Sequence, residues 1–150
     1  MVSAGIVTRR RATPAPGKTR ILFVCVGNSC RSQMAEAFAR AYGSDVLAPA
    51  SAGLMPAGGI APLTHEVLAE KNITADGQFP KSLGFFAREQ FDVMVNMSGL
   101  AVPEMAPRCM EWTVEDPIGQ KPEVYRAVAN QIENLVMQLI LNLRASRQPA

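Results

Sequence analysis

The segment best suited to chemistry is a short loop with a cysteine and, six positions later, an arginine. It reads Cys25-Val-Gly-Asn-Ser-Cys-Arg31. A thiolate is a strong nucleophile, and a guanidinium presents a planar pair of donors that matches an oxyanion. This spacing is common by chance, and on spacing alone Cys25 is better interpreted as a buried strand-end cysteine and Arg31 as a solvated charge.

The elements predicted on either side of the loop favour the chemical interpretation. Residues 20–25 form an apolar run that breaks at Gly27, which predicts a buried strand. Residues 32–42 place apolar side chains at helical spacing and stop before Gly43, which predicts a helix. The loop amides and the positive end of this helix can converge on one anion, and the same environment favours the thiolate form of Cys25.

The other residues of the loop suit this task. Gly27 permits a backbone turn that a side chain would obstruct. Asn28 can tie the loop to itself or adopt a left-handed conformation, and Ser32 can donate to the thiolate or cap the helix. We expect oxyanion binding or loop support from Val26, Gly27, Asn28, Ser29, Cys30 and Ser32.

A carboxylic acid is predicted near the same loop. Residues 109–114 are expected to form a fourth strand, and Glu115-Asp116-Pro117 follows it. The carboxyl ends of parallel strands share one edge of the sheet, where such folds place their sites. Asp116 is therefore the candidate general acid for a leaving group. Taken alone, an Asp before Pro117 is more often a turn residue, and that alternative stays open.

The rest of the chain completes an α/β pattern. Strands are predicted over residues 46–51 and 91–96, and helices over residues 62–71 and from Pro122 to about Arg147. Strands that alternate with helices predict a three-layer sandwich with a central four-stranded parallel sheet flanked by helices.

Length and composition predict one domain. The chain has 150 residues, of which 48% are hydrophobic. We expect a disordered extension over residues 1–18, a domain over residues 19–147 and a flexible tail over residues 148–150. Because no apolar stretch has the length of a signal peptide or a membrane span, a cytoplasmic protein with no membrane partner is predicted.

Charge and cysteine usage exclude further classes. The net charge is +2, but five of the fifteen basic residues fall in the first twenty positions, so we expect no nucleic-acid partner. Three cysteines without a secretion signal argue against a disulfide framework. With His65 as the only imidazole, a zinc site would need unusual spacings. We expect no metal and no cofactor, and interpret His65 as a surface residue.

Taken together, these features resemble the low-molecular-weight protein tyrosine phosphatase superfamily, including its arsenate reductase branch. The resemblance covers about residues 19–144 and is most specific over residues 21–36, which read ILFVCVGNSCRSQMAE. It implies a nucleophile at Cys25, a phosphate-binding arginine at Arg31 and a general acid at Asp116. It also implies loop-ordering, thiolate-supporting and segment-supporting roles at Asn28, Ser32 and Ser51-Ala52-Gly53.

The features specific to each branch are incomplete in this chain. Residues 28–36 resemble arsenate reductases, because phosphatases of this superfamily usually carry Pro where Gln33 stands. Thioredoxin-coupled reductases place two further cysteines just after the third strand, where this chain reads NMSGLAVPEM, and Cys109 follows later. Tyrosine phosphatases place aromatic residues after the Asp-Pro, where this chain has Ile118-Gly119.

The function predicted first is hydrolysis of a phosphate monoester, protein tyrosine phosphatase-like, through a cysteinyl-phosphate intermediate. One alternative is arsenate reduction by the same Cys25 with an external thiol as reductant. Another is a non-catalytic oxyanion-binding module. Cys30 can either form a disulfide with Cys25 on oxidation or pack beneath the loop, and both alternatives stay open.

Overall fold

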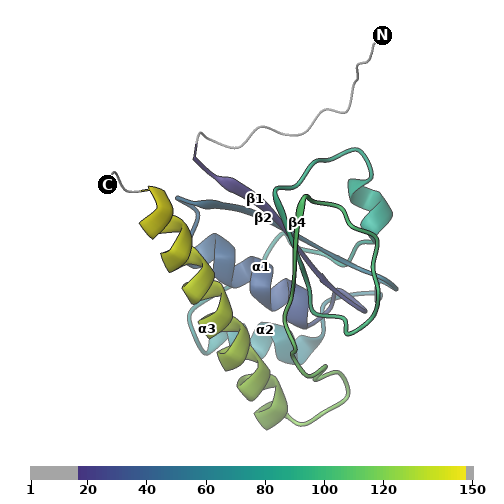
Figure 1. The fold of residues 1–150 in the computed structure, drawn as a ribbon. Coiled ribbons are helices and arrows are strands. Elements are labelled where there is room, and N and C mark those ends of the chain that lie inside the picture. The colour runs from purple at the N-terminus through teal and green to yellow at the C-terminus, as the bar shows by residue number, and fades with distance from the viewer. Residues whose placement is uncertain (1–16, 148–150) are drawn as a thin grey trace.

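The computed structural model describes residues 17–147, so the predictions for residues 1–16 and 148–150 lie outside the described part of the chain. Apart from one short 3-10 helix, the elements follow one another along the chain as predicted (Figure 1). They are β1 (Thr19–Cys25), α1 (Arg31–Tyr42), β2 (Leu47–Gly53), α2 (Pro62–Ala69), the 3-10 helix η1 (Leu83–Phe86), β3 (Val93–Asn96), β4 (Arg108–Glu111) and α3 (Pro122–Arg147).

The strands form one four-stranded sheet in the order β2-β1-β3-β4. Every neighbouring pair is parallel, which confirms the predicted sheet. Side chains of β1 alternate between two cores, as the pleat of a strand requires. Ile21 and Phe23 pack with the three α-helices, whereas Leu22 and Val24 pack with η1 and the loop after β3. The sheet is therefore the middle layer of a sandwich.

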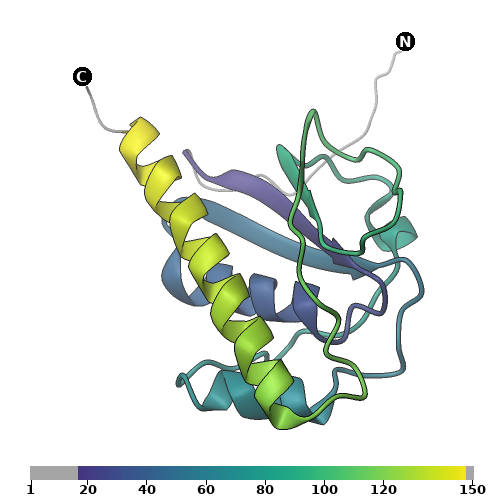
Figure 2. The same cartoon turned by 60° about the horizontal axis from the view of Figure 1, so that its bottom comes forward.

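The helical layer is held together by α3, which lies across α1 and α2 (Figure 2). Its buried residues repeat at helical spacing, from Tyr125 through Val128, Ile132 and Val136 to Ile140. This stripe is the amphipathic pattern predicted from the sequence. Within the described residues, no helix is both long and apolar enough to cross a membrane.

Several predicted boundaries were wrong. The strand predicted over residues 109–114 spans Arg108–Glu111. Its neighbour β3 ends at Asn96, whose carbonyl accepts from the Trp112 N–H at 3.0 Å, and the chain then turns toward the loop after β1. The strand predicted over residues 91–96 begins at Val93. The strand predicted over residues 46–51 spans Leu47–Gly53 and so pairs with β1 to its end.

The helix predicted over residues 62–71 ends at Ala69, two residues early. The Ile73 N–H returns to the carbonyl of Leu68 at 3.0 Å, and Asn72 between them has a left-handed φ of 62°. This is the geometry of a helix C-terminus, and it closes the helix before the predicted end. The short helix η1 was not predicted.

Candidate oxyanion site

The loop predicted to carry the chemistry lies at the carboxyl edge of the sheet, between the end of β1 and the start of α1. Cys25 is the last residue of β1 and pairs with Gly53 of β2. A Cβ atom at Gly53 would lie 2.7 Å from the carbonyl oxygen of Val26 and 2.8 Å from the backbone nitrogen of Asn28. These contacts are with backbone atoms, so only glycine lets the loop pass this closely over β2.

The carbonyl groups of the loop bond away from its centre. Those of Cys25, Val26 and Gly27 accept hydrogen bonds from the backbone of the segment after β2, at 3.1, 2.8 and 2.9 Å. Further along, the Asn28 carbonyl accepts from the Gln33 side chain at 3.0 Å, and the Ser29 carbonyl accepts from Thr64 Oγ1 at 2.9 Å. Because these carbonyls accept hydrogen bonds from outside the loop, the backbone amides of the loop remain available to bind an anion at its centre.

The candidate nucleophile is held by a buried serine. Cys25 is 2% exposed, and its Sγ lies 2.9 Å from Ser32 Oγ. Asn28 Nδ2 donates to Ser32 Oγ at 2.7 Å and to Ser51 Oγ at 3.0 Å. Because Ser32 accepts from Asn28, its own proton is free to point at the sulfur, and a donor there stabilises a thiolate. The N-cap of α1 is Cys30, with no side-chain cap, so Ser32 serves the thiol rather than the helix end.

Asn28 combines the two properties predicted for it, a left-handed backbone conformation and hydrogen bonds that hold the loop. Its φ of 50° is left-handed, and its side chain ties the loop to Ser32 and Ser51. Its Oδ1 accepts a hydrogen bond from the Lys81 backbone N–H at 2.9 Å, which fixes the orientation of the amide. Ser51 in turn donates to Glu36 at 2.5 Å. The side chain of Asn28 therefore supports the loop from behind and does not face the anion site.

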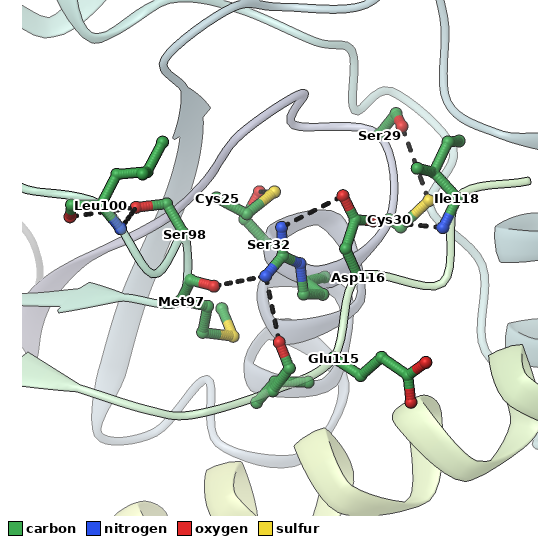
Figure 3. Close-up of polar contacts among 12 residues, drawn as sticks. Cys25, Ser29, Cys30, Ser32, Met97, Ser98, Leu100, Glu115, Asp116 and Ile118 are labelled. Atoms are coloured by element: carbon green, nitrogen blue, oxygen red, sulfur yellow. Dashed lines mark hydrogen bonds and ion pairs between the residues drawn. The ribbon is translucent and has the colours of Figure 1, made fainter.

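Arg31 is anchored so that one edge of its guanidinium stays free. Nη1 donates to the carbonyls of Met97 and Val114, at 2.5 and 3.0 Å, and Nη2 lies 3.4 Å from Asp116 Oδ2 (Figure 3). The side chain is buried, yet Nε has no hydrogen-bond partner among residues 17–147. An unsatisfied buried donor is costly, so its presence beside the loop indicates a place for an acceptor ligand.

Asp116 combines the two roles considered for it. Its Oδ1 accepts from the Ile118 N–H at 3.1 Å, as a turn aspartate does, while Oδ2 faces Arg31. Its side chain is 41% exposed. The turn geometry thus presents one carboxylate oxygen at the mouth of the site, next to the guanidinium.

These groups surround a cavity of about 150 Å³. It is lined by Cys25, Val26, Gly27, Ser29, Cys30, Arg31, Ala57, Asp116 and Ile118. Three predicted residues, Asn28, Ser32 and Ser51, are fully buried outside this lining and brace the loop from behind. His65 is exposed on α2, as predicted.

The supporting shell contains polar residues that sequence reasoning missed. Glu36 is 5% exposed and accepts from Ser51 and from Arg40, the latter at 2.7 Å. Gln78 donates to Gln33 Oε1 at 2.7 Å. Gln33 and Glu36 are polar residues on the face of α1 that packs inward. Buried polar side chains need hydrogen-bond partners, so this pattern could have predicted polar contacts beneath the loop.

The three cysteines have different surroundings. Cys30 is buried and donates to the Tyr125 hydroxyl at 3.6 Å. Cys109 is exposed on β4 and pairs in register with Met94. Through Met94, Cys109 is level with Leu22 of β1, which is two strands away, and Cys25 lies three residues beyond Leu22. The strand spacing and the rise per residue therefore put the Cα atoms of Cys25 and Cys109 roughly 14 Å apart. A disulfide needs Cα atoms within about 7 Å, so Cys109 cannot reach Cys25 without backbone movement.

Comparison with known proteins agrees with this geometry. The family model for low molecular weight phosphotyrosine protein phosphatase matches residues 20–149. A glutaredoxin arsenate reductase of Synechocystis sp. is 35% identical over 129 residues, which cover 83% of this chain and 98% of that protein.

Solved structures of two activities resemble the fold. An arsenate reductase in the phosphate binding state is 33% identical with a TM-score of 0.77, over 83% of this chain and 98% of that one. A low molecular weight protein tyrosine phosphatase from T. tengcongensis is 31% identical with a TM-score of 0.70, over 83% of this chain and 99% of that one.

Proposed function

We propose that this chain, which belongs to the low molecular weight phosphotyrosine protein phosphatase family, is a cysteine-dependent hydrolase of phosphate monoesters. The observation that carries the proposal is the free edge of Arg31. Its Nη1 donates to two carbonyls and Nη2 lies beside Asp116, while buried Nε has no partner in the described part of the chain. A tetrahedral oxyanion in the cavity would satisfy Nε and lie close to the Cys25 sulfur.

In the first step the Cys25 thiolate attacks phosphorus, and the bond from phosphorus to the leaving oxygen breaks. The loop amides and Arg31 stabilise the charge on the three equatorial oxygens. Asp116 delivers its proton to the leaving oxygen as that bond breaks. Ser32 Oγ, 2.9 Å from the sulfur, can donate to it while it attacks and again when it leaves.

In the second step water attacks the cysteinyl phosphate and releases inorganic phosphate. Asp116, now a carboxylate, takes a proton from that water, and the sulfur leaves as the thiolate that began the cycle. No external reductant enters this cycle. Ile118 forms an aliphatic side of the cavity, so the leaving group is not restricted to an aromatic ring.

A second candidate is arsenate reduction, because curated relatives that align over most of this chain are named arsenate reductase. Cys25 would attack arsenate and displace water. An external thiol would then attack the Cys25 sulfur, which releases arsenite and leaves a mixed disulfide, and a second thiol would restore Cys25. An external reductant is required in this route, because Cys109 is too distant to act and a disulfide between Cys25 and Cys30 would itself need reduction.

The two candidates separate in a paired assay of one protein sample. Phosphatase activity predicts turnover of an aryl phosphate without added thiol. Reductase activity predicts arsenite formation that depends on both arsenate and thiol. Phosphate binding without turnover in either assay would instead support a non-catalytic oxyanion-binding module.

A variant of Asp116 tests the mechanism within the phosphatase assay. For Asp116→Asn we expect a loss of ~10²–10⁴-fold with esters whose leaving groups are poor, the range typical of general acid catalysis. The loss should shrink as the pKa of the leaving group falls, because a stable anion needs no proton. Equal losses with good and poor leaving groups would show that Asp116 only stabilises the turn and does not donate a proton.

A further inference from the structure

Tyr125 joins two parts of the candidate site that are distant in sequence. It lies near the start of α3 and is 3% exposed. Its hydroxyl oxygen accepts a hydrogen bond from Cys30 Sγ at 3.6 Å, across 95 positions of the sequence. Cys30 is the residue directly before Arg31, so this bond reaches the end of the oxyanion loop.

The same phenol faces the turn that carries Asp116. Burial raises the pKa of Tyr125. The phenol therefore stays protonated at any working pH. The Asp116 charge raises the pKa of Tyr125 as well and the Gly119 backbone lowers it, so both lie close to the phenol, and Gly119 has a left-handed φ of 75°.

The Asp116 turn needs such an anchor. Four of its residues, Glu115, Asp116, Ile118 and Gly119, are exposed. Arg31 holds the turn from one side, through the Val114 carbonyl and the Asp116 carboxylate. Exposed segments with few buried contacts open locally at low cost in free energy. A second anchor on the other side would keep the carboxyl over the cavity.

We propose that Tyr125 is a positioning residue that holds the Asp116–Gly119 turn against the oxyanion loop and so keeps the Asp116 carboxyl beside the leaving group. The inference rests on the proposed function, because a leaving group needs the proton only in ester hydrolysis. It assigns a role in the reaction to a residue that does not line the cavity.

The test compares two Tyr→Phe variants. Tyr125→Phe keeps the ring and removes the hydroxyl. Tyr42→Phe is the matched control, since Tyr42 is the other tyrosine of the chain and donates to Glu133 at 2.7 Å, where α1 packs on α3. For Tyr125→Phe we expect kcat to fall about 2- to 10-fold with poor leaving groups, the effect of one hydrogen bond, and to stay unchanged with good ones.

A second measurement does not depend on turnover. Amide hydrogen exchange at Gly119, followed by NMR, should be faster in Tyr125→Phe and unchanged in Tyr42→Phe. If the wild-type protein hydrolyses no ester, the proposed function fails, yet the exchange data still test the anchor. Unchanged exchange at Gly119, or equal kcat losses with good and poor leaving groups, would overturn the role of Tyr125.

A variant of Cys30 removes the same hydrogen bond without changing Tyr125, so the test does not depend on one variant that could misfold. Cys30→Ala removes the thiol while Tyr125 keeps its ring and hydroxyl. If the phenol acts through Cys30, this variant should reproduce the dependence on the leaving group, and Tyr125→Phe should add little to it. Full additivity of the two changes would show that the hydrogen bond between them carries no coupling.

Discussion

Replacing Arg31 by lysine is the sharpest test of how the site holds an oxyanion. The substitution keeps the positive charge but removes the planar set of donors. In the structure Nη1 is used by the carbonyls of Met97 and Val114, and the edge formed by Nε and Nη2 remains for the ligand. A single ammonium cannot bond to the buried carbonyls and also to two oxygens of an oxyanion.

The size of the effect can be worked from the hydrogen bonds that lysine cannot make. A hydrogen bond to a charged group contributes roughly 1.5–3 kcal/mol. Arg31→Lys keeps at most one of the two bonds to the oxyanion and also leaves a buried carbonyl without its donor. A total of roughly 2–4 kcal/mol corresponds to a loss of about 30- to 1000-fold in kcat/KM. Because the same bonds hold bound phosphate, its inhibition constant should rise as well.

The assay is kcat/KM for an aryl phosphate together with inhibition by inorganic phosphate. Arg126→Lys is the matched control, because Arg126 makes a bidentate contact with Glu70 at 3.0 Å that is half exposed and lies between α2 and α3. An exposed pair of this kind contributes little to stability, so the control should keep its activity. Equal kinetics in Arg31→Lys and Arg126→Lys would refute the assignment of the free edge to the oxyanion.

Two further predictions concern the thiols. Cys25→Ser should abolish turnover while phosphate affinity and thermal stability stay close to wild type, because a neutral hydroxyl fills the space but is a weak nucleophile near pH 7; substantial residual activity would remove Cys25 as the nucleophile. Mild peroxide should join Cys25 to Cys30, whose thiols line the same cavity, and peptide mapping by mass spectrometry should identify that link. A Cys25–Cys109 link, or none, would contradict this pairing.

The sequence predicted the fold well because the determining signals are local. The apolar run of residues 20–25 and the stripe along α3 specify their elements almost without context. The error at the fourth strand has a physical cause. Residues 112–114 continue the same composition, but the chain leaves the sheet after Glu111 so that the Val114 carbonyl can meet Arg31.

The site was predictable only where its residues are neighbours in sequence. Cys25, Ser32 and Arg31 lie within one strand, loop and helix, so their meeting follows from local geometry. Lys81 and Tyr125 reach the loop across 53 and 95 positions. No periodicity encodes such contacts, because they depend on how separate elements pack.

The burial of the nucleophile bears on the choice between the two candidate reactions. Both begin with the same adduct at Cys25, and they differ in what attacks next. Hydrolysis needs only a water molecule at phosphorus, which a cavity of about 150 Å³ can admit beside the bound group. Reduction needs a second sulfur to reach Cys25 Sγ itself, and that residue is 2% exposed behind the oxyanion loop. Cys109 is out of reach, so this sulfur would come from Cys30 of the same loop, or from a small external thiol that enters where the oxyanion lies or through an opened loop. The hydrogen bonds of Asn28 oppose an opening of the loop, and a disulfide between Cys25 and Cys30 would still need an external reductant. Hydrolysis needs only water, and for this reason we propose it as the first candidate.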